Sequence, residues 1–409
     1  MSHPPDVATE EEERRTTFLE LFFDLVLVFA ITQLATLAHE VPHHGHVLMG
    51  ISQTSLLAVM IWWLWSQFAW LGTSVELSAS RPRALMLALT GLMLIAAIAL
   101  PVGLEPGVSV FGIAYALVKL GALALFRMDG GDDPAHAAAV NDYVPKAAVA
   151  PLLVLAGAFL GPGPRLAAWS IAMVMEVGGT LLSGGQAFRI SPAHFAERHS
   201  LVLIIVLGEA VVALGTHASP TDLTPATIAS LLGGFGLVAT MWWSYFAWAF
   251  GATELWLRGK GRPFAPGDGG AQGRMARDAF TFGHFPLVAG FIAMAVGLKD
   301  LAADPLHPWH VEAQVAVSVG LALYLGGFVA VVYRGNGYLL WERLIALALM
   351  VATTALSPLP AGLTAALLAL QLALTIAVEV RRWSRYEERV RRASASSASP
   401  SANTPPAGD

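Results

Sequence analysis

Long apolar stretches constrain the fold of this chain more than any other feature of its sequence. Runs of roughly 20 apolar residues recur from end to end, and that length matches the hydrocarbon core of a bilayer. Only 13% of the residues are charged and 56% are hydrophobic, whereas a soluble domain carries about twice this charged fraction. The sequence therefore predicts an all-α polytopic membrane protein, whose solvent is the lipid bilayer, rather than a series of soluble domains.

Twelve transmembrane helices fit these runs. Their expected limits are 17–38, 48–72, 82–101, 108–127, 146–161, 165–183, 199–217, 226–250, 278–298, 311–333, 340–357 and 361–382. The fifth is short, with Pro145 just before it and Pro151 inside it, so it is the least regular of the set. The first run has the length of a full span rather than of a signal-peptide core, so we expect no cleaved signal peptide.

Basic residues orient this arrangement. With the N-terminus inside, all but three of the 24 Lys and Arg residues fall in cytoplasmic segments; Arg165 and Lys299 fall outside, and Lys119 falls within a span. Segments on the cytoplasmic side of membrane proteins are enriched in Lys and Arg. We therefore expect both termini to be cytoplasmic.

The two halves of the chain share an aromatic pattern. Its copies are Trp62-Trp63 with Phe68-Ala69-Trp70, and Trp242-Trp243 with Phe246-Ala247-Trp248. The two copies lie 178–180 residues apart. A similar offset of 177 residues maps Glu20 onto Glu197, and each Glu precedes a long apolar run. Since six spans per half is an even number, the halves are predicted to be two parallel six-helix repeats, an arrangement found among transporters.

The expected organisation has four parts. A cytoplasmic tail of residues 1–16 precedes the first repeat, 17–188, and the second repeat, 189–383. Residues 384–409 end in Ser, Ala and Pro and are expected to form a disordered cytoplasmic tail. The longest connection, Leu257 to Arg277, is rich in Gly, Pro and Arg and joins the eighth and ninth spans on the cytoplasmic side.

Three ionisable residues fall near the middle of predicted spans. They are Lys119, Glu176 and Glu209. A charged side chain at the bilayer centre costs roughly 2.5–3.5 kcal/mol on insertion scales, so such residues face the protein interior and are paired or used. One interpretation is a buried structural ion pair of Lys119 with Glu176 or Glu209. The other is a relay for ions or protons.

Further polar residues fall near the cytoplasmic ends of spans. Glu20 and Asp24 lie one turn apart on one face of the first span. A helix N-terminus stabilises carboxylates, which explains Glu20, but Asp24 lies too far into the helix and is a functional candidate. His284 stands two residues before Pro286 in the ninth span and is either a packing residue or a functional one.

The loop after the first span is rich in histidine. It runs from His39 to His46 and contains His39, Glu40, His43, His44 and His46. These side chains could bind Zn²⁺ or sense pH, but their spacing fits no particular metal motif. The chain has no Cys, which excludes thiolate metal sites and disulfides. We expect no metal site and no cofactor.

Three motifs resemble a known family. The segment from Glu20 through Asp24 and Gln33 to Ala35 is similar to the signature of the bacterial low temperature requirement protein A family. The segments 197–209 and 282–290 resemble its second and third motifs, with Ser200 where Gly is expected. The resemblance implies a multi-pass protein of the bacterial inner membrane, in a family named for a growth phenotype in the cold. It also implies a set of family polar positions: Glu20, Asp24, Gln33, Glu197, His199, Glu209 and His284.

The first span also resembles, over a shorter stretch, a family of potassium channels with a Phe-Ser-Asp motif. Phe23-Asp24 followed by Ala30-Ile31-Thr32 carries this resemblance. That family also builds twelve spans from two sixes, with the first helices lining the pore. Here Phe22-Phe23-Asp24 replaces the motif, and the second repeat lacks the aspartate.

The leading hypothesis is a transporter or a protein for ion or proton permeation, with its site between the first and seventh spans. Asp24 and Glu209 would bind the proton, cation or small solute, and Lys119 or Glu176 would be their counter-charges. A membrane enzyme acting on lipids and a non-catalytic envelope or cold-stress protein remain as alternatives. No feature points to nucleic acid, and the sequence leaves the oligomeric state open.

Overall fold

The computed structural model describes residues 16–41, 46–74, 79–128, 134–182, 191–218, 223–249 and 273–397. Twelve helices dominate this part of the chain, and no strand occurs within it. The helices are α1 (Phe18–Glu40), α2 (Val47–Ser74), α3 (Ser80–Ala99), α4 (Val110–Met128), α5 (Pro134–Gly157), α6 (Pro162–Leu182), α7 (Pro192–His217), α8 (Pro225–Ser244), α11 (Gly283–Ala303), α12 (Val311–Asn336), α13 (Trp341–Leu356) and α14 (Ala361–Ser397).

Short segments of other helix types adjoin three of these helices. The 3-10 turn η2 (Leu100–Val102) follows α3, and the π-helical segments η4 (Tyr245–Ala249) and η5 (Ala276–Phe282) follow α8 and precede α11. Most of the expected connection from Leu257 to Arg277 lies outside the described residues, as do residues 42–45 of the histidine-rich loop.

Ten of the helices are long and apolar enough to cross a membrane. The other two are α5, whose apolar part is Tyr143–Gly157, and α13, which has 16 residues. At 1.5 Å per residue α13 is about 24 Å long, somewhat less than the roughly 30 Å of a hydrocarbon core. The sequence thus predicted the number of helices, and ten of them meet the length and hydropathy expected of a span.

Several helix limits differ from the predicted ones. The fifth helix runs over 134–157 rather than 146–161, because Pro145 and Pro151 are accommodated inside it. The last helix continues to Ser397, past residue 384, where the disordered tail was expected to begin. Its sequence from Arg381 to Arg392 lacks Gly and Pro and is rich in Arg and Glu, which are good helix formers.

Hydrogen bonds between loops show that successive helices alternate in direction. The guanidinium of Arg165 donates to the carbonyl oxygens of Gly103 at 3.0 Å and Leu160 at 2.8 Å. The α3–α4 and α5–α6 connections therefore lie on one side. In the second half, the amide of Ala361 donates to the carbonyl of His307 at 2.8 Å, which joins the α11–α12 and α13–α14 connections in the same way.

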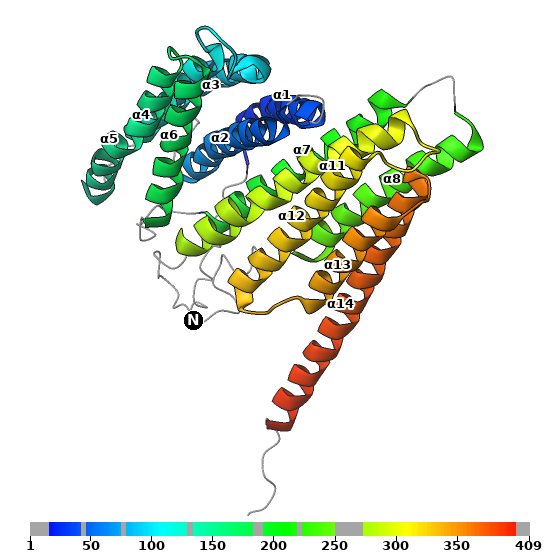
Figure 1. Ribbon diagram of the computed structural model, residues 1–409. Helices are drawn as coiled ribbons and strands as arrows, with labels where there is room; N and C mark the ends of the chain where they lie inside the picture. Colours follow the sequence, from blue (N-terminus) through cyan, green and yellow to red (C-terminus); the bar gives the residue numbers. More distant parts are fainter. Residues whose placement is uncertain are drawn as a thin grey trace, which may run out of the picture.

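The helices form two groups with α1 and α2 between them (Figure 1). The helices α3 to α6 lie together on one side, and α7, α8 and α11 to α14 form the other group. Three helices that are distant in sequence, α1, α7 and α11, pack against one another, and α2 covers α1 and α7. The middle of the molecule is therefore built from the first helices of both halves.

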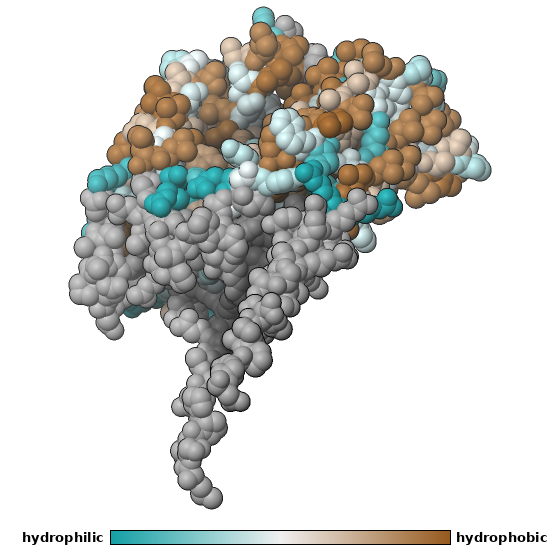
Figure 2. Space-filling model, turned by 90° about the horizontal axis from the view of Figure 1, so that it is seen from below, coloured by the Kyte–Doolittle hydropathy of each residue, from teal (hydrophilic) through white to brown (hydrophobic). Residues whose placement is uncertain are grey.

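The outer surface is largely apolar. Large hydrophobic side chains are exposed along many helices, for example Leu25, Ile98, Val174 and Leu349. Figure 2 shows apolar residues over much of one face, with hydrophilic residues gathered in a strip across it. Such exposure suits helices that face lipid, because lipid tails solvate apolar side chains.

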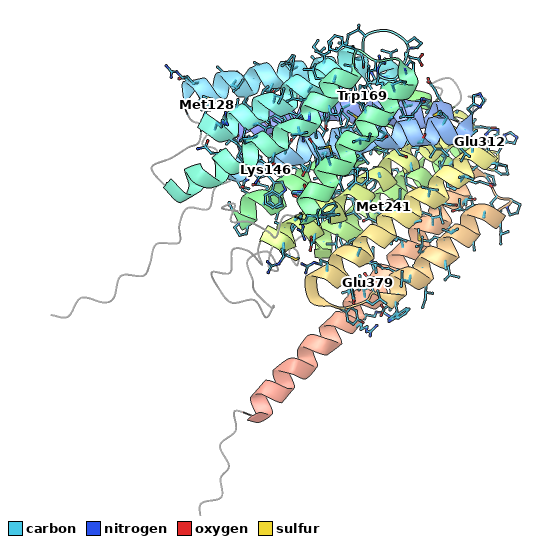
Figure 3. The ribbon with its side chains drawn as sticks, turned by 60° about the vertical axis from the view of Figure 1, so that its left-hand side comes forward. Met128, Lys146, Trp169, Met241, Glu312 and Glu379 are labelled. Atoms are coloured by element: carbon cyan, nitrogen blue, oxygen red, sulfur yellow. The ribbon has the colours of Figure 1, made fainter. Side chains whose placement is uncertain are left out.

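A buried ion pair fixes the last helix. Arg343 of α13 donates to the carboxylate of Glu379 of α14 through Nε and Nη2, at 2.8 and 2.9 Å. Its Nη1 donates to the hydroxyl of Ser244. Its guanidinium lies 3.4 Å from the ring centroid of Phe328. Glu379 lies where α14 leaves the bundle (Figure 3). This pair joins α8, α12, α13 and α14 at one level.

Candidate functional site

A face with two acids meets a face with two bases between α1 and α7. Glu20 and Asp24 are one turn apart on α1, and His194 and Arg198 are one turn apart on α7. Residues four apart lie above one another on a helix, so each helix presents a vertical pair to the other. All four side chains are fully buried. We call these four residues the acid–base cluster.

Glu20 has two structural tasks in this cluster. It completes a capping box at the start of α1, in which its carboxylate accepts from the amide and hydroxyl of Thr17, both at 2.8 Å. The same carboxylate contacts Nε2 of His194 at 3.0 and 3.2 Å and Nη1 of Arg198 at 3.4 Å. The predicted helix N-terminal role of Glu20 is present, and the carboxylate also joins α1 to α7.

Asp24 is held by two donors. Its Oδ1 accepts from Nη2 of Arg198 at 2.5 Å and from the indole N–H of Trp65 at 2.9 Å. Arg198 also donates to the carbonyl of Phe68, at 3.1 Å, and its guanidinium lies 5.9 Å from the Trp65 ring. A charge-assisted bond of this kind offsets the cost of burying both ions. Arg198 is therefore the counter-charge of Asp24, and the expectation that Lys119 or Glu176 would fill that role is wrong.

The cluster retains hydrogen-bonding capacity. Of the seven buried side-chain atoms without a partner among the described residues, four lie in or beside the cluster: Oδ2 of Asp24, Nδ1 of His194, Nε of Arg198 and Nε2 of His199. Buried polar atoms are nearly always satisfied in folded proteins, so four such atoms around one cluster mark it as unusual. Gly72 of α2 closes the cluster, because a Cβ there would overlap with Oε1 of Glu20 and lie 3.0 Å from Cε1 of His194.

An aromatic cage follows the cluster along α7. His199 lies with its ring centroid 5.0 Å from that of Trp65, 4.5 Å from Phe195 and 5.3 Å from His284. His199 donates from Nδ1 to the carbonyl of Phe195 at 2.8 Å, since a carbonyl can only accept. The structure thus brings His199 and His284 together beside the acid–base cluster.

The ring of His284 is held from both sides. Its Nδ1 donates to the carbonyl of Ala279 at 3.0 Å, so its Nε2 faces the hydroxyl of Tyr245 at 2.8 Å. It is stacked on Phe280, with ring centroids 5.1 Å apart. The two hydrogen bonds fix the tautomer of this histidine, and together with the stacking they fix its orientation.

A second polar group lies further along the same three helices. The carboxylate of Glu209 on α7 accepts from the hydroxyl of Thr32 on α1 at 2.5 Å. Lys299 of α11 is buried and interacts electrostatically with Glu209 and with Glu40 at the end of α1. Gln33 is half-buried next to Thr32. We call Glu209, Thr32 and Lys299 the second polar group.

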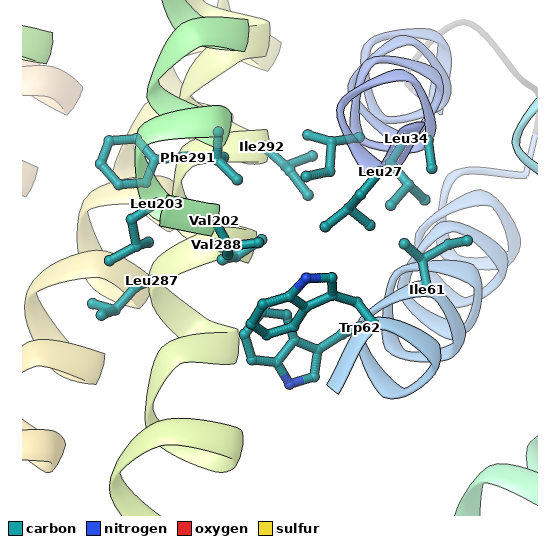
Figure 4. Packing of buried hydrophobic residues seen from close by; sticks show 14 of the residues in the cluster. Leu27, Leu34, Ile61, Trp62, Val202, Leu203, Leu287, Val288, Phe291 and Ile292 are labelled. Carbon is teal, nitrogen blue, oxygen red and sulfur yellow. The ribbon is translucent and has the colours of Figure 1, made fainter. Parts of the chain in front are cut away.

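An apolar layer separates the acid–base cluster from the second polar group. Leu27 of α1, Trp62 of α2, Val202 of α7 and Val288 of α11 point toward one another in this layer (Figure 4), and all four are buried. From Asp24 to Thr32, eight residues of helix span about 12 Å. Charged groups therefore occur at two levels along α1, α7 and α11, with this apolar layer between them. We call this three-helix unit the seam.

The remaining predicted site residues lie elsewhere. Lys119 of α4 and Glu176 of α6 form an ion pair of 2.8 Å with each other, with 6% and 9% of their side chains exposed. This agrees with the interpretation as a buried structural pair and separates both residues from the seam. Glu197 of α7 accepts from the amide and the hydroxyl of Thr16, both at 3.1 Å, and so ties the segment before α1 to α7.

Two residues of the cluster were missed in the sequence. The predicted seventh span, 199–217, leaves Arg198 among the cytoplasmic Lys and Arg residues. In the structure α7 begins at Pro192, so that Arg198 lies inside the helix. Pro at the first helical position is a recognised start signal and would have put His194 and Arg198 inside the helix. Their spacing of four, matching that of Glu20 and Asp24, was the second available signal.

The family model of the bacterial low temperature requirement A protein (LtrA) matches residues 15–379. The chain belongs to this family. It is thus a multi-pass protein of the cell membrane, in agreement with the ten apolar helices of spanning length among the described residues. A protein of Rhizobium meliloti (strain 1021) that is described as uncharacterized is 26% identical over 380 residues, which cover 90% of this chain and 89% of the relative. No solved structure matches the chain.

The match covers every helix that forms the seam. In this LtrA protein the acid–base cluster therefore lies within the family's own region rather than in an appended segment. The structural roles of its polar positions differ: Glu20, Asp24, His199 and His284 meet in or beside the cluster, whereas Glu209 lies beyond the apolar layer.

Proposed function

We propose that this LtrA protein moves a small cation or protons across the membrane along the seam. The observation that carries the proposal is the pair of buried polar levels with an apolar layer between them. Charges buried in a membrane protein are costly and mark ion or proton pathways. The stability of the fold does not require these buried charges, because apolar residues of similar volume often stabilise a protein as well as a buried ion pair does.

The apolar layer acts as a closed gate in this conformation. Leu27, Val202 and Val288 are buried apolar side chains at the level between Asp24 and Glu209. Constrictions of this kind gate channels by excluding water, and transporters open such layers alternately to either side. An ion would bind at one level, and a relative movement of α1, α7 and α11 would expose it to the other.

A parallel repeat of the two halves would allow this movement. The helix α1 packs on α2 and α3 as α7 packs on α8 and α11, and α3 packs on α4 as α11 packs on α12. The pairs α4–α5 and α5–α6 likewise correspond to α12–α13 and α13–α14. We propose that the halves are related by an axis along the membrane normal, with both termini in the cytoplasm.

Contacts between α1 and α7 agree with such an axis. With the offset of 177 residues, Thr32 corresponds to Glu209, and these two positions touch each other. Positions that lie on a two-fold axis contact their own equivalents. Reciprocally, Glu20 bonds to the start of α7 and the equivalent Glu197 bonds to the start of α1. The seam would then lie at the interface of the repeats, where transporters bind their substrates.

The test is flux in vesicles reconstituted with purified protein, using H⁺, Na⁺ and K⁺ gradients in turn. Asp24→Asn and Glu209→Gln are expected to abolish flux. Glu176→Gln is the matched control, because it also removes one carboxylate from a buried ion pair, but outside the seam. Equal loss of flux in all three variants, or flux unchanged in the two seam variants, would refute the proposal.

A further inference from the structure

We infer that the ion carried through the seam is a proton, and that His194 is the group that holds it in the acid–base cluster. This inference rests on the proposed transport function but concerns a residue and a ligand that the function itself does not specify. His194 Nδ1, Asp24 Oδ2 and Arg198 Nε are buried atoms without a partner among the described residues. They show that the cluster is not saturated by its own bonds.

Charge balance is the first argument. The cluster contains two carboxylates, Glu20 and Asp24, and one permanent cation, Arg198, all fully buried. With neutral His194 the cluster carries one net negative charge away from water. An uncompensated buried charge is strongly unfavourable. One proton on His194 would make the cluster neutral.

The geometry of His194 is the second argument. Its Nε2 lies 3.0 and 3.2 Å from the two oxygens of Glu20. Because an ionised carboxylate can only accept, Nε2 carries a hydrogen. The other ring nitrogen, Nδ1, is buried without a partner in the described part of the chain. That nitrogen is the position at which the imidazole gains or loses a proton while its bond to Glu20 persists.

The groups around His194 favour a proton over a metal cation. Arg198 already bonds to Asp24 at 2.5 Å and to Glu20 at 3.4 Å. A second cation on the same oxygens would stand next to a guanidinium. Hard cations also need several oxygen ligands, whereas Oδ2 of Asp24 is the one carboxylate oxygen of the cluster without a bond in the described residues. A proton needs only one acceptor.

Every helix packed around His194 contributes to its surroundings. The helix α1 provides the two carboxylates, and α7 provides Arg198 and His199. From α2 come the neutral Trp65 indole and the carbonyl of Phe68, and α11 adds His284 beyond His199. The unbonded Nε2 of His199 is the next acceptor toward the apolar layer. A proton leaving His194 would thus find an acceptor on the same helix.

The experiment uses the intact protein in detergent and in vesicles. In detergent, tryptophan fluorescence is followed against pH, because the Trp65 indole bonds to Asp24 and lies over Arg198. A titration step is expected in the unchanged protein and should be absent in both His194→Gln and Trp65→Phe. Gln can still donate to Glu20 but cannot take up a proton. In vesicles, H⁺ flux driven by a K⁺ diffusion potential should be lost in His194→Gln and kept in the control His217→Gln, at the other end of α7.

The outcomes separate the two proposals. A His194-dependent titration step without any ion flux would leave the proton site standing and refute transport. Flux of Na⁺ or K⁺ without H⁺ flux, or H⁺ flux unchanged in His194→Gln, would overturn the inference and leave transport standing. If His194→Gln does not fold, the double variant Glu20→Gln/His194→Gln removes the proton together with the charge that it balances. That variant should fold and lack the step, and a persisting step would overturn the inference.

Discussion

Arg198 decides the electrostatics of the cluster at the level of single residues. It is the permanent cation that faces both Glu20 and Asp24, and its guanidinium is fully buried. Glu20 has partners in Thr17 and His194, but Asp24 depends on Arg198 and on one neutral indole. The consequence of losing Arg198 should therefore be concentrated at Asp24.

We expect Arg198→Met to destabilise the protein by about 3–5 kcal/mol, because it leaves an uncompensated buried carboxylate. Thermal unfolding of the purified protein measures this. The double variant Asp24→Asn/Arg198→Met should recover part of the loss. The control Arg382→Met breaks an exposed ion pair with Glu342 and should change the melting temperature far less, because exposed ion pairs contribute little to stability. Equal losses in both Arg variants would contradict the assignment.

A second residue-level prediction concerns pH and lies outside the membrane-spanning segments. His310 precedes α12 and contacts Oδ1 of Asp300 through Nδ1, at 2.8 Å. The hydrogen bond and the charge of Asp300 raise the pKa of His310 above its ordinary value of 6.5. Since the folded-state pKa exceeds the unfolded one, the pair stabilises the fold fully below pH 6.5. This contribution is lost as the pH rises through the raised pKa.

The variant His310→Gln should therefore melt at a lower temperature than the unchanged protein below pH 6.5, and the difference should shrink as the solution becomes alkaline. Melting temperatures across a pH series measure it. The exposed His217→Gln provides the baseline. A difference that grew with increasing pH would show that the sign is wrong.

At the scale of elements, α11 and α12 approach each other through glycines. A Cβ at Gly320 would lie 2.8 Å from the carbonyl oxygen of Gly290 and 3.0 Å from the amide nitrogen of Met294. Small residues permit such close backbone contact between membrane helices, where packing rather than the hydrophobic effect drives association. Because α11 also packs on α1 and α7, this contact positions one wall of the seam.

We expect Gly320→Ala to cost about 1–3 kcal/mol, since the added methyl group must push the helices apart. Gly326→Ala on the same helix is the matched control, because its Cβ would have no neighbour within 4 Å. That change should be neutral or stabilise by up to about 1 kcal/mol, as Ala favours helix. Unfolding of each variant in detergent measures the change in its unfolding free energy relative to the unchanged protein. A control that is as damaging as Gly320→Ala would show that the close contact between α11 and α12 is not responsible for the loss.

The helices could largely be predicted from the sequence, whereas the cluster could not. Apolar runs determine where a spanning helix must be, so most helix limits agree within a few residues. The bond between Asp24 and Arg198 joins positions 174 residues apart. No local period specifies such a pairing. Near a helix start, a basic residue is equally compatible with a cytoplasmic loop and with a buried partner, and only the packing of α1 on α7 distinguishes the two.

At the scale of the whole molecule, the alternating helix directions put the connections in two sets. Glu105 and Leu223 belong to one set, and Ser80 and Tyr338 belong to the other. The excess of Lys and Arg falls on the second set, to which the start of α1 and the end of α14 also belong. By the positive-inside rule that set should be cytoplasmic. The short helix α13 is the critical element, since the order of sides after it holds only if it crosses the membrane.

Single cysteines test this arrangement without background, because the chain has no Cys. In spheroplasts, a membrane-impermeant maleimide should label Glu105→Cys and Leu223→Cys directly, and Ser80→Cys and Tyr338→Cys only after permeabilisation. Ser357→Cys, at the far end of α13 from Tyr338, should be labelled directly. Labelling of positions 338 and 357 from the same side would show that α13 does not cross. The helix α14 would then begin on the cytoplasmic side, and the Arg residues near its end would lie outside the cell, against the positive-inside rule.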